Sequence, residues 1–151
     1  MKILYHHRIA SKDGMYVHVE ELTNAMLEQG VDLHFVCPGF SHNAEFGSEG
    51  GFSAKLRARL PSAAYEVLEL GYSLLIAIKL INAIIRFKPE VIYERYSLYQ
   101  PAGVFVAKLF GIPLLLEVNA PLAEERKKHN RQRLYSLAKR IENYTWRNAS
   151  W

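Results

Sequence analysis

The stretch Ile3-Leu-Tyr-His-His-Arg-Ile-Ala-Ser-Lys-Asp-Gly-Met-Tyr-Val-His-Val-Glu-Glu-Leu22 runs from an apolar segment of β type, through a polar loop with a single glycine, into a helical pattern. The pattern of apolar residues predicts a strand over Lys2–His6 and a helix over Met15–Gln29. One face of that helix is apolar and consists of Val19, Leu22, Ala25 and Met26. A strand, a loop and a helix in this order form the building unit of α/β proteins.

The same alternation continues along the chain. Further strands are predicted over Val31–Cys37, Val91–Tyr93 and Pro113–Val118, and a surface loop over Phe40–Ser53. The predicted helices are Ser53–Arg86 with an interruption at Pro61, Gln100–Phe110, and one helix from Pro121 onward with Leu134, Leu137, Ile141 and Tyr144 on one face. Strands that alternate with helices pair in parallel, so the predicted fold class is α/β, a Rossmann-like, doubly wound parallel sheet.

Composition predicts a single domain over residues 1–151, because 50% hydrophobic residues are enough to build one core in a chain of this length. Cys37 is the single cysteine and cannot form an internal disulfide, and no signal-peptide core follows Met1, so a cytoplasmic setting is expected. Residues 1–120 hold 11 Lys or Arg against 12 Asp or Glu, whereas residues 121–151 hold 8 against 3. This basic segment is either a solvated helix face or a surface for an anionic partner.

The most apolar segment is Leu70–Ile85. It is shorter than the roughly 20 residues that span a bilayer, and it contains Lys79 and Asn82. On a helix these two residues and Arg86 form one polar stripe. We therefore expect a buried or interfacial helix here.

Ligands of doubly wound folds bind at the carboxyl ends of the strands. The segments at that edge are His7–Gly14, Pro38–Gly47, Glu94–Tyr99 and Asn119–Leu122. The first of them lacks the G-x-G-x-x-G fingerprint, which argues against a dinucleotide site. The chain also shows no nucleophile elbow, Walker loop, Cys-x-x-Cys or His-Glu-x-x-His motif, so several enzyme classes are excluded.

The first segment contains candidate binding residues. Asp13 and Gly14 precede a predicted helix, where free backbone N–H groups can hold a phosphate or carboxylate, although Asp13 can equally be a simple N-cap. His18 follows on the first turn and either faces the same cleft or is structural. His6 and His7 are adjacent on a strand and point to opposite faces, so together they cannot chelate a metal, and no metal site is expected.

The ends of the third and fourth strands supply the other candidates. Arg95 can clamp a phosphate or sugar hydroxyls, or it forms an ion pair with Glu94 or Glu117. Glu117 and Asn119 are two residues apart and point to the same side. The amide of Asn119 is suited to hydroxyl recognition rather than to nucleophilic catalysis.

Four motifs resemble the N-terminal, acceptor-side domain of the retaining glycosyltransferases of family four, which have the two-domain GT-B fold. They are M-K-I-L-Y-H-H-R, D-G-x-x-V-H-x-x-E-L, P-E-V-I-Y-E-R-Y and G-I-P-L-L-L-E-V-N-A-P-L, which begin at Met1, Asp13, Pro89 and Gly111. The resemblance covers essentially the whole chain and is least specific over residues 40–88.

The resemblance implies one half of a GT-B fold, with a C-terminal nucleotide-sugar-binding domain that this chain does not contain. We therefore expect a fragment that is inactive alone. In the family, the amide at Gly14 approaches donor phosphate or acceptor, and His18 matches a helix histidine after that loop. Asn119 stands where many relatives have a histidine, which argues against an acid–base role at this position.

The implied reaction is the retaining transfer of a sugar from a UDP- or GDP-sugar to a hydroxyl of a glycan or lipid-linked acceptor, in cell-envelope or exopolysaccharide synthesis. The resemblance implies a hexosyltransferase with no cofactor, no obligatory metal and no nucleic-acid partner. Relatives that use lipid-linked acceptors bind membranes through this domain, so Lys55, Arg57 and Arg59 are the candidates for peripheral contact with the inner face of the membrane.

Two further interpretations stay open. Apolar surface that a second domain would cover favours self-association of the fragment. The alternative function is a stand-alone, non-catalytic Rossmann-like module that binds an anionic partner.

Overall fold

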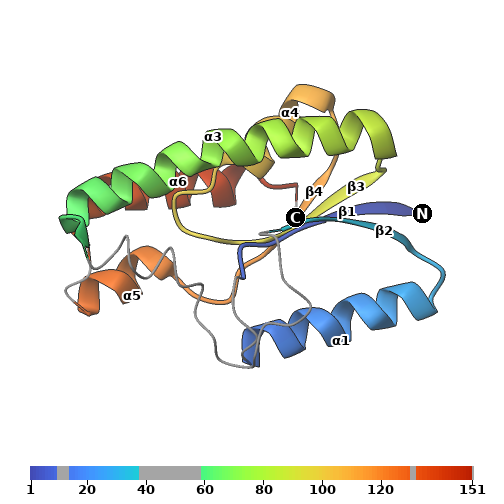
Figure 1. The fold of residues 1–151 in the computed structure, drawn as a ribbon, viewed down its shortest axis with the longest axis horizontal. Helices are drawn as coiled ribbons and strands as arrows, with labels where there is room; N and C mark the ends of the chain where they lie inside the picture. Colours follow the sequence, from blue (N-terminus) through green and yellow to red (C-terminus); the bar gives the residue numbers. More distant parts are fainter. Residues whose placement is uncertain (10–13, 38–58, 130–131, 151) are drawn as a thin grey trace.

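The protein is an α/β sandwich around one parallel sheet (Figure 1). The computed structural model describes residues 1–9, 14–37, 59–129 and 132–150. Its four strands are β1 (Lys2–His6), β2 (Asp32–Val36), β3 (Val91–Arg95) and β4 (Leu114–Glu117), in the spatial order β2-β1-β3-β4. Every neighbouring pair is parallel. The predicted Rossmann-like, doubly wound sheet is confirmed.

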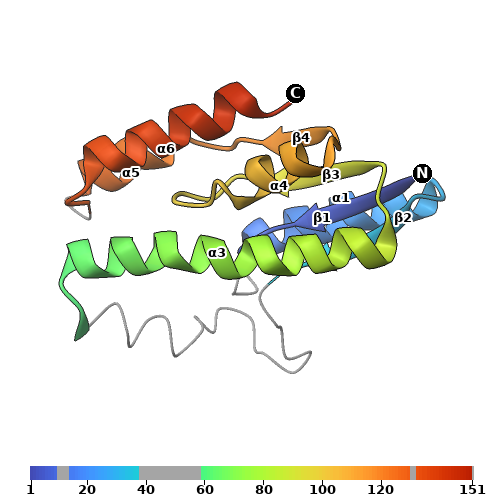
Figure 2. The ribbon, with the colours of Figure 1, turned by 90° about the horizontal axis from the view of Figure 1, so that it is seen from above.

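Five helices are described around the sheet: α1 (Gly14–Glu28), α3 (Ser62–Phe87), α4 (Ala102–Phe110), α5 (Leu122–Lys128) and α6 (Tyr135–Asn148). α1 covers one face of the sheet, and α3, α4 and α6 lie on the other (Figures 1 and 2). The strand predicted over Lys2–His6 agrees with β1 residue for residue, and most other predicted boundaries differ by one or two residues. The predicted Phe40–Ser53 loop lies outside the described residues.

The two faces of the sheet have separate cores because side chains alternate along each strand. Leu4, Ile92 and Leu114 pack against α3 and α4. On the other face, Tyr5 packs with Val19 of α1. The register pairs Leu4 with Ile92 and Ile92 with Leu114, so the core under α3 and α4 runs across three strands.

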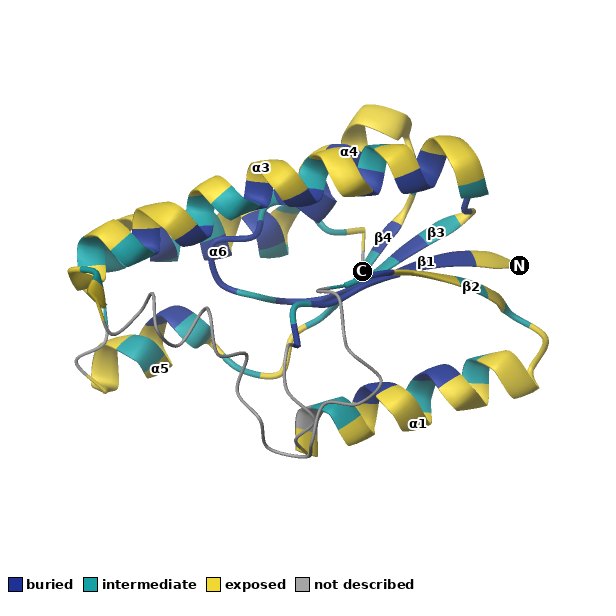
Figure 3. Ribbon diagram, viewed as in Figure 1, coloured by how far each residue is buried: buried dark blue, intermediate teal, exposed yellow. Residues whose placement is uncertain are grey.

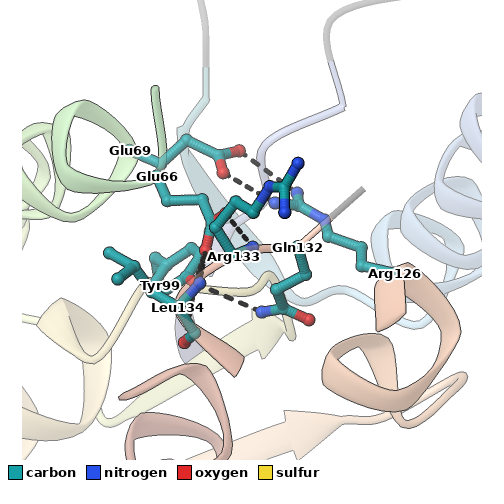
Figure 4. A network of polar contacts seen from close by, with 7 residues as sticks. All are labelled: Glu66, Glu69, Tyr99, Arg126, Gln132, Arg133 and Leu134. Carbon is teal, nitrogen blue, oxygen red and sulfur yellow. Dashed lines mark hydrogen bonds and ion pairs between the residues drawn. The ribbon is translucent and has the colours of Figure 1, made fainter. Parts of the chain in front are cut away.

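The single helix predicted from Pro121 onward is wrong, because the structure has two helices with a break between Lys128 and Tyr135. The backbone N–H groups of Arg133 and Leu134 donate to the carboxylate of Glu66 in α3, at 2.7 and 3.0 Å (Figure 4). These donors are therefore directed at a distant side chain rather than at carbonyls one turn earlier. The predicted apolar face also differs, because Leu137 and Tyr144 are exposed while Ala138, Glu142 and Thr145 are buried.

α3 agrees within one residue with the helix predicted after Pro61, and it is only partly buried. It has 26 residues, and by length and composition alone it could cross a membrane, although only 33% of its most apolar window is buried. The predicted polar residues Lys79, Asn82 and Arg86 are exposed. Large apolar side chains are exposed as well, and Figure 3 shows the outer side of α3 as largely exposed and its inner side as buried. They are Val67, Leu68, Leu74, Leu75, Ile78 and Ile85.

The inner side of α3 holds two acidic residues at its N-terminal end. Glu66 accepts the two backbone N–H bonds described above, and Glu69 forms a two-pronged ion pair with Arg126 of α5, at 2.6 and 3.1 Å (Figure 4). Burial lowers the pKa of Arg126, but the hydrogen bonds and the charge of Glu69 raise it by more. The pKa of Arg126 therefore lies above its ordinary value. Both acids thus fasten α3 to the chain that follows β4.

Replacement of Glu66 with Gln should lower the free energy of unfolding by about 2–3 kcal/mol, because a buried carboxylate that accepts several hydrogen bonds is lost and an amide N–H₂ group faces N–H donors. Urea denaturation followed by circular dichroism measures the change. Glu21→Gln, on the exposed side of α1, is the matched control and should change stability by no more than about 0.5 kcal/mol. Equal effects of the two substitutions would contradict the bonding of Glu66.

Candidate functional site

The candidate site lies at the carboxyl ends of β3 and β4, on the α1 face of the sheet. Arg95 ends β3 and Glu117 ends β4, and the register places these two residues side by side. Arg95 Nη1 donates to Glu117 Oε1 at 2.7 Å. The structure thus selects Glu117, rather than Glu94, as the partner of Arg95.

Glu117 is the centre of a cluster of polar side chains. Its Oε1 atom also accepts a hydrogen bond from Asn119 Nδ2 at 2.9 Å. His18 Nε2, from the first turns of α1, lies 3.4 Å from the same oxygen and forms an ion pair with it when the imidazole is protonated. Four of the predicted site residues, from three separate elements, therefore meet at one carboxylate.

The cluster has a buried part and an exposed part. The side chains of Arg95 and Glu117 are only 10% and 13% exposed, whereas that of His18 is 56% exposed. Asn119 is exposed as well. A ligand therefore reaches an imidazole and an amide first, and the ion pair beneath holds these groups in place. The ring nitrogens of an imidazole and the side-chain amide of an asparagine can form hydrogen bonds with sugar hydroxyls.

The sequence analysis missed two tyrosines beneath the cluster. Tyr93 donates its hydroxyl to Glu117 Oε2 at 3.4 Å, and the ring of Tyr5 stacks on the ring of Tyr93 with centroids 5.0 Å apart. Burial and the charge of Glu117 raise the pKa of both tyrosines, so both hydroxyls stay protonated. The signal was present in the sequence, because Tyr93 and Arg95 are two residues apart on one strand and share a face.

Gly14 is the first residue of α1 and is exposed. A Cβ atom at this position would meet nothing within 4 Å among the described atoms. Packing against the described residues therefore does not require a glycine here, and the backbone is open to a ligand on the side of the missing Cβ atom. Asp13, Lys55 and Arg57 lie outside the described residues, and Arg59 is exposed.

The adjacent histidines of β1 lie on opposite faces, and both are buried. His6 Nδ1 lies 3.6 Å from Glu94 Oε2 on the α4 face. His7 lies on the other face, with its ring 6.0 Å from that of Tyr5, and its Nδ1 atom accepts the N–H of Ile9. Burial, with the neighbouring charges of His6 and Arg95, lowers the pKa of His7 to about 4. The imidazole of His7 is therefore neutral near pH 7, and in this form it accepts a hydrogen bond within the loop that follows β1.

Glu94 is fully buried, and its carboxylate lies against Gly103 of α4. A Cβ atom at position 103 would lie 1.4 Å from Glu94 Oε2. The side-chain polar atoms of His6, Glu94 and Gln100 have no hydrogen-bond partner among the described residues. This buried polar group is on the opposite face of the sheet from Glu117.

Other kinds of site receive little support. In the part of the chain that the structure describes, no group of three His, Cys, Asp or Glu side chains is placed to hold a metal ion. An apolar groove of about 430 Å³ lies between α3, α4 and α6 and contains none of the predicted site residues. The cluster around Glu117 is therefore the site that the structure supports best.

Comparison with known proteins identifies the family to which the chain is similar. The model of Glycosyltransferase Family 4 matches residues 12–151. The matched range includes all the side chains that meet at Glu117. No curated protein matches the chain.

The free energy of unfolding should fall as pH is lowered from about 6.5 to about 4, because His7 stays neutral in the folded protein while the unfolded chain takes up a proton. Above the ordinary pKa both states are neutral, and the stabilisation is complete. The expected contribution of His7 to this loss is about 3 kcal/mol. Urea denaturation at several pH values measures it.

His7→Asn keeps an acceptor for the N–H of Ile9 and should flatten this pH dependence. His129→Asn is the control, because His129 is exposed, and it should leave the slope as it is. An unchanged slope in His7→Asn would show that His7 does not hold this neutral state.

Proposed function

The chain belongs to glycosyltransferase family 4, and from this membership we propose that the cluster around Glu117 binds the acceptor hydroxyl in a sugar transfer. The donor in this proposal is a UDP- or GDP-sugar. The transfer retains the configuration of the sugar and is of the hexosyltransferase type.

The observation that carries the proposal is the contact of Arg95, Asn119 and His18 with one carboxylate oxygen. The cluster lies at the carboxyl edge of a parallel sheet, where ligands of this fold class bind. The exposed imidazole and amide offer a donor and an acceptor that can hold a hydroxyl group. The buried ion pair of Arg95 and Glu117 fixes their positions before a ligand arrives.

In the proposed reaction, the acceptor oxygen forms a bond to the anomeric carbon while the bond between that carbon and the diphosphate breaks. The nucleoside diphosphate leaves with the bonding electron pair and takes up the proton of the acceptor hydroxyl. Negative charge develops on the departing diphosphate, and fixed N–H donors and helix dipoles stabilise it. The backbone at Gly14, at the N-terminal end of α1, is the part of this chain best suited to approach it. We propose that a C-terminal domain supplies most of the other donors, and that this chain alone transfers no sugar.

The acceptor in this proposal is a glycan or a lipid-linked sugar of cell-envelope or exopolysaccharide synthesis, used on the cytoplasmic side. The exposed apolar side of α3 and the exposed Arg59 support a peripheral contact with a membrane. Lys55 and Arg57 belong to the same proposed contact. The exposed apolar residues of α3 are equally compatible with self-association.

The complete gene product should transfer sugar from one member of a panel of UDP- and GDP-sugars. His18→Ala and Asn119→Ala should each lower kcat/KM about tenfold or more, since one lost hydrogen bond to a bound hydroxyl is worth roughly this factor. Gly14→Trp should abolish transfer, because the indole would fill the open space beside the backbone. Steady-state assays of nucleotide release measure all three.

Asn24→Ala, on the exposed side of α1, is the control and should leave the kinetics unchanged. Unchanged kinetics in His18→Ala, Asn119→Ala and Gly14→Trp would refute the proposed acceptor site. Sugar transfer by residues 1–151 alone would show that the donor site does not need a second domain.

A further inference from the structure

Two buried carboxylates join the segment that follows β3 to the segment that follows β4. The first is Glu66 of α3, which is 2% exposed. It accepts the hydroxyl of Tyr99 at 2.5 Å, and it also accepts the backbone N–H groups of Arg133 and Leu134 (Figure 4). Gln132 Nε2 completes this bridge by donating to the hydroxyl of Tyr99 at 3.2 Å.

The second carboxylate is Glu142 of α6, which is fully buried. Its Oε2 atom accepts the hydroxyl of Tyr96 at 3.2 Å and the backbone N–H of Ala123 in α5, also at 3.2 Å. Both carboxylates thus bind a tyrosine from the β3–α4 segment and a backbone N–H from the α5–α6 region.

The backbone of Tyr99 adds to the case. Its φ angle is 61°, in the left-handed region that a bulky L residue rarely occupies. The residue is fully buried, and the bond from its hydroxyl to Glu66 helps to hold this conformation. A strained conformation persists only where its surroundings fix it, so the bridge defines the path of the chain after β3.

These two segments leave β3 and β4 directly after the residues of the candidate site. Tyr96 directly follows Arg95. Ala123, in the first turn of α5, follows shortly after Asn119. The pair of Arg126 and Glu69 fastens the same helix to α3 (Figure 4). The segments that carry Arg95 and Asn119 are therefore joined to each other through buried side chains. The contact of α1 with this site is the one between His18 and Glu117, at 3.4 Å.

We propose that Tyr96 and Tyr99 are positioning residues, which with Glu142 and Glu66 lock the segments after β3 and β4 into one block and so fix Asn119 relative to Arg95. They do not contact the substrate themselves. Their effect on sugar transfer rests on the proposed function, but the locking is a property of this chain and is measured without a substrate.

Native-state hydrogen exchange of the wild-type protein is the first test. Backbone amides of residues 96–100 and of residues 122–128 and 134–140 should open together, with one common free energy and one common dependence on urea, because the bridges make them one cooperative unit. α1 should open independently. Separate openings of the two segments would overturn the proposal.

Single-oxygen deletions are the second test. Tyr96→Phe and Tyr99→Phe should each speed the exchange of the α5 amides about tenfold and shift the side-chain amide resonance of Asn119, while β1 and β2 stay unchanged. Tyr144→Phe, an exposed tyrosine of α6, is the control and should change neither. If either variant fails to fold, the other variant and the wild-type exchange decide the outcome.

Kinetics of the complete gene product separate positioning from a merely structural role. Tyr96→Phe and Tyr99→Phe should lower kcat/KM for the acceptor about tenfold or more, measured well below the unfolding midpoint, and should leave KM for the donor unchanged. A lower unfolding midpoint with unchanged acceptor kinetics would overturn the positioning role. Absence of transfer in the wild type, with the exchange and resonance shifts as expected, would refute the proposed function and leave the locking of the two segments intact.

Discussion

The two-residue alternation of side chains along β3 is the constraint on which the rest of the structure depends. Glu94 points to the α4 face and Arg95 to the α1 face, because successive residues of a strand face opposite sides. The parallel register places His6 beside Glu94 and Glu117 beside Arg95. A slip of one residue would put the guanidinium under α4 and the buried carboxylate on the α1 face.

The same constraint explains how much the sequence alone could predict. The alternating strands and helices were readable, and so was the convergence of Arg95, Glu117 and Asn119, because the carboxyl ends of parallel strands share one edge. Tyr93 is harder to predict, because it lies two positions before the end of β3, on the same face as Arg95. The break between α5 and α6 could not be read locally, because its cause is a carboxylate at Glu66, far away along the chain.

α3 shows how one helix can serve two environments. Its acids, Glu66 and Glu69, face inward and are bonded, while its outer side combines exposed apolar residues with the cations Lys79 and Arg86. A helix that crossed a bilayer would remove both carboxylates from their partners, at a cost of several kcal/mol each. The polar bonds of the inner side therefore argue that this helix lies along the sheet, whatever its outer side contacts.

The contact between Glu94 and Gly103 has a consequence for the evolution of this chain. Because the carboxylate of Glu94 occupies the place of a Cβ atom, a side chain at position 103 would require that carboxylate to move. A shorter residue at position 94 would open that space and leave His6 buried without its neighbouring acid. The two positions are thus expected to change together among relatives, and their covariation would record a packing constraint on the face of the sheet opposite the candidate site.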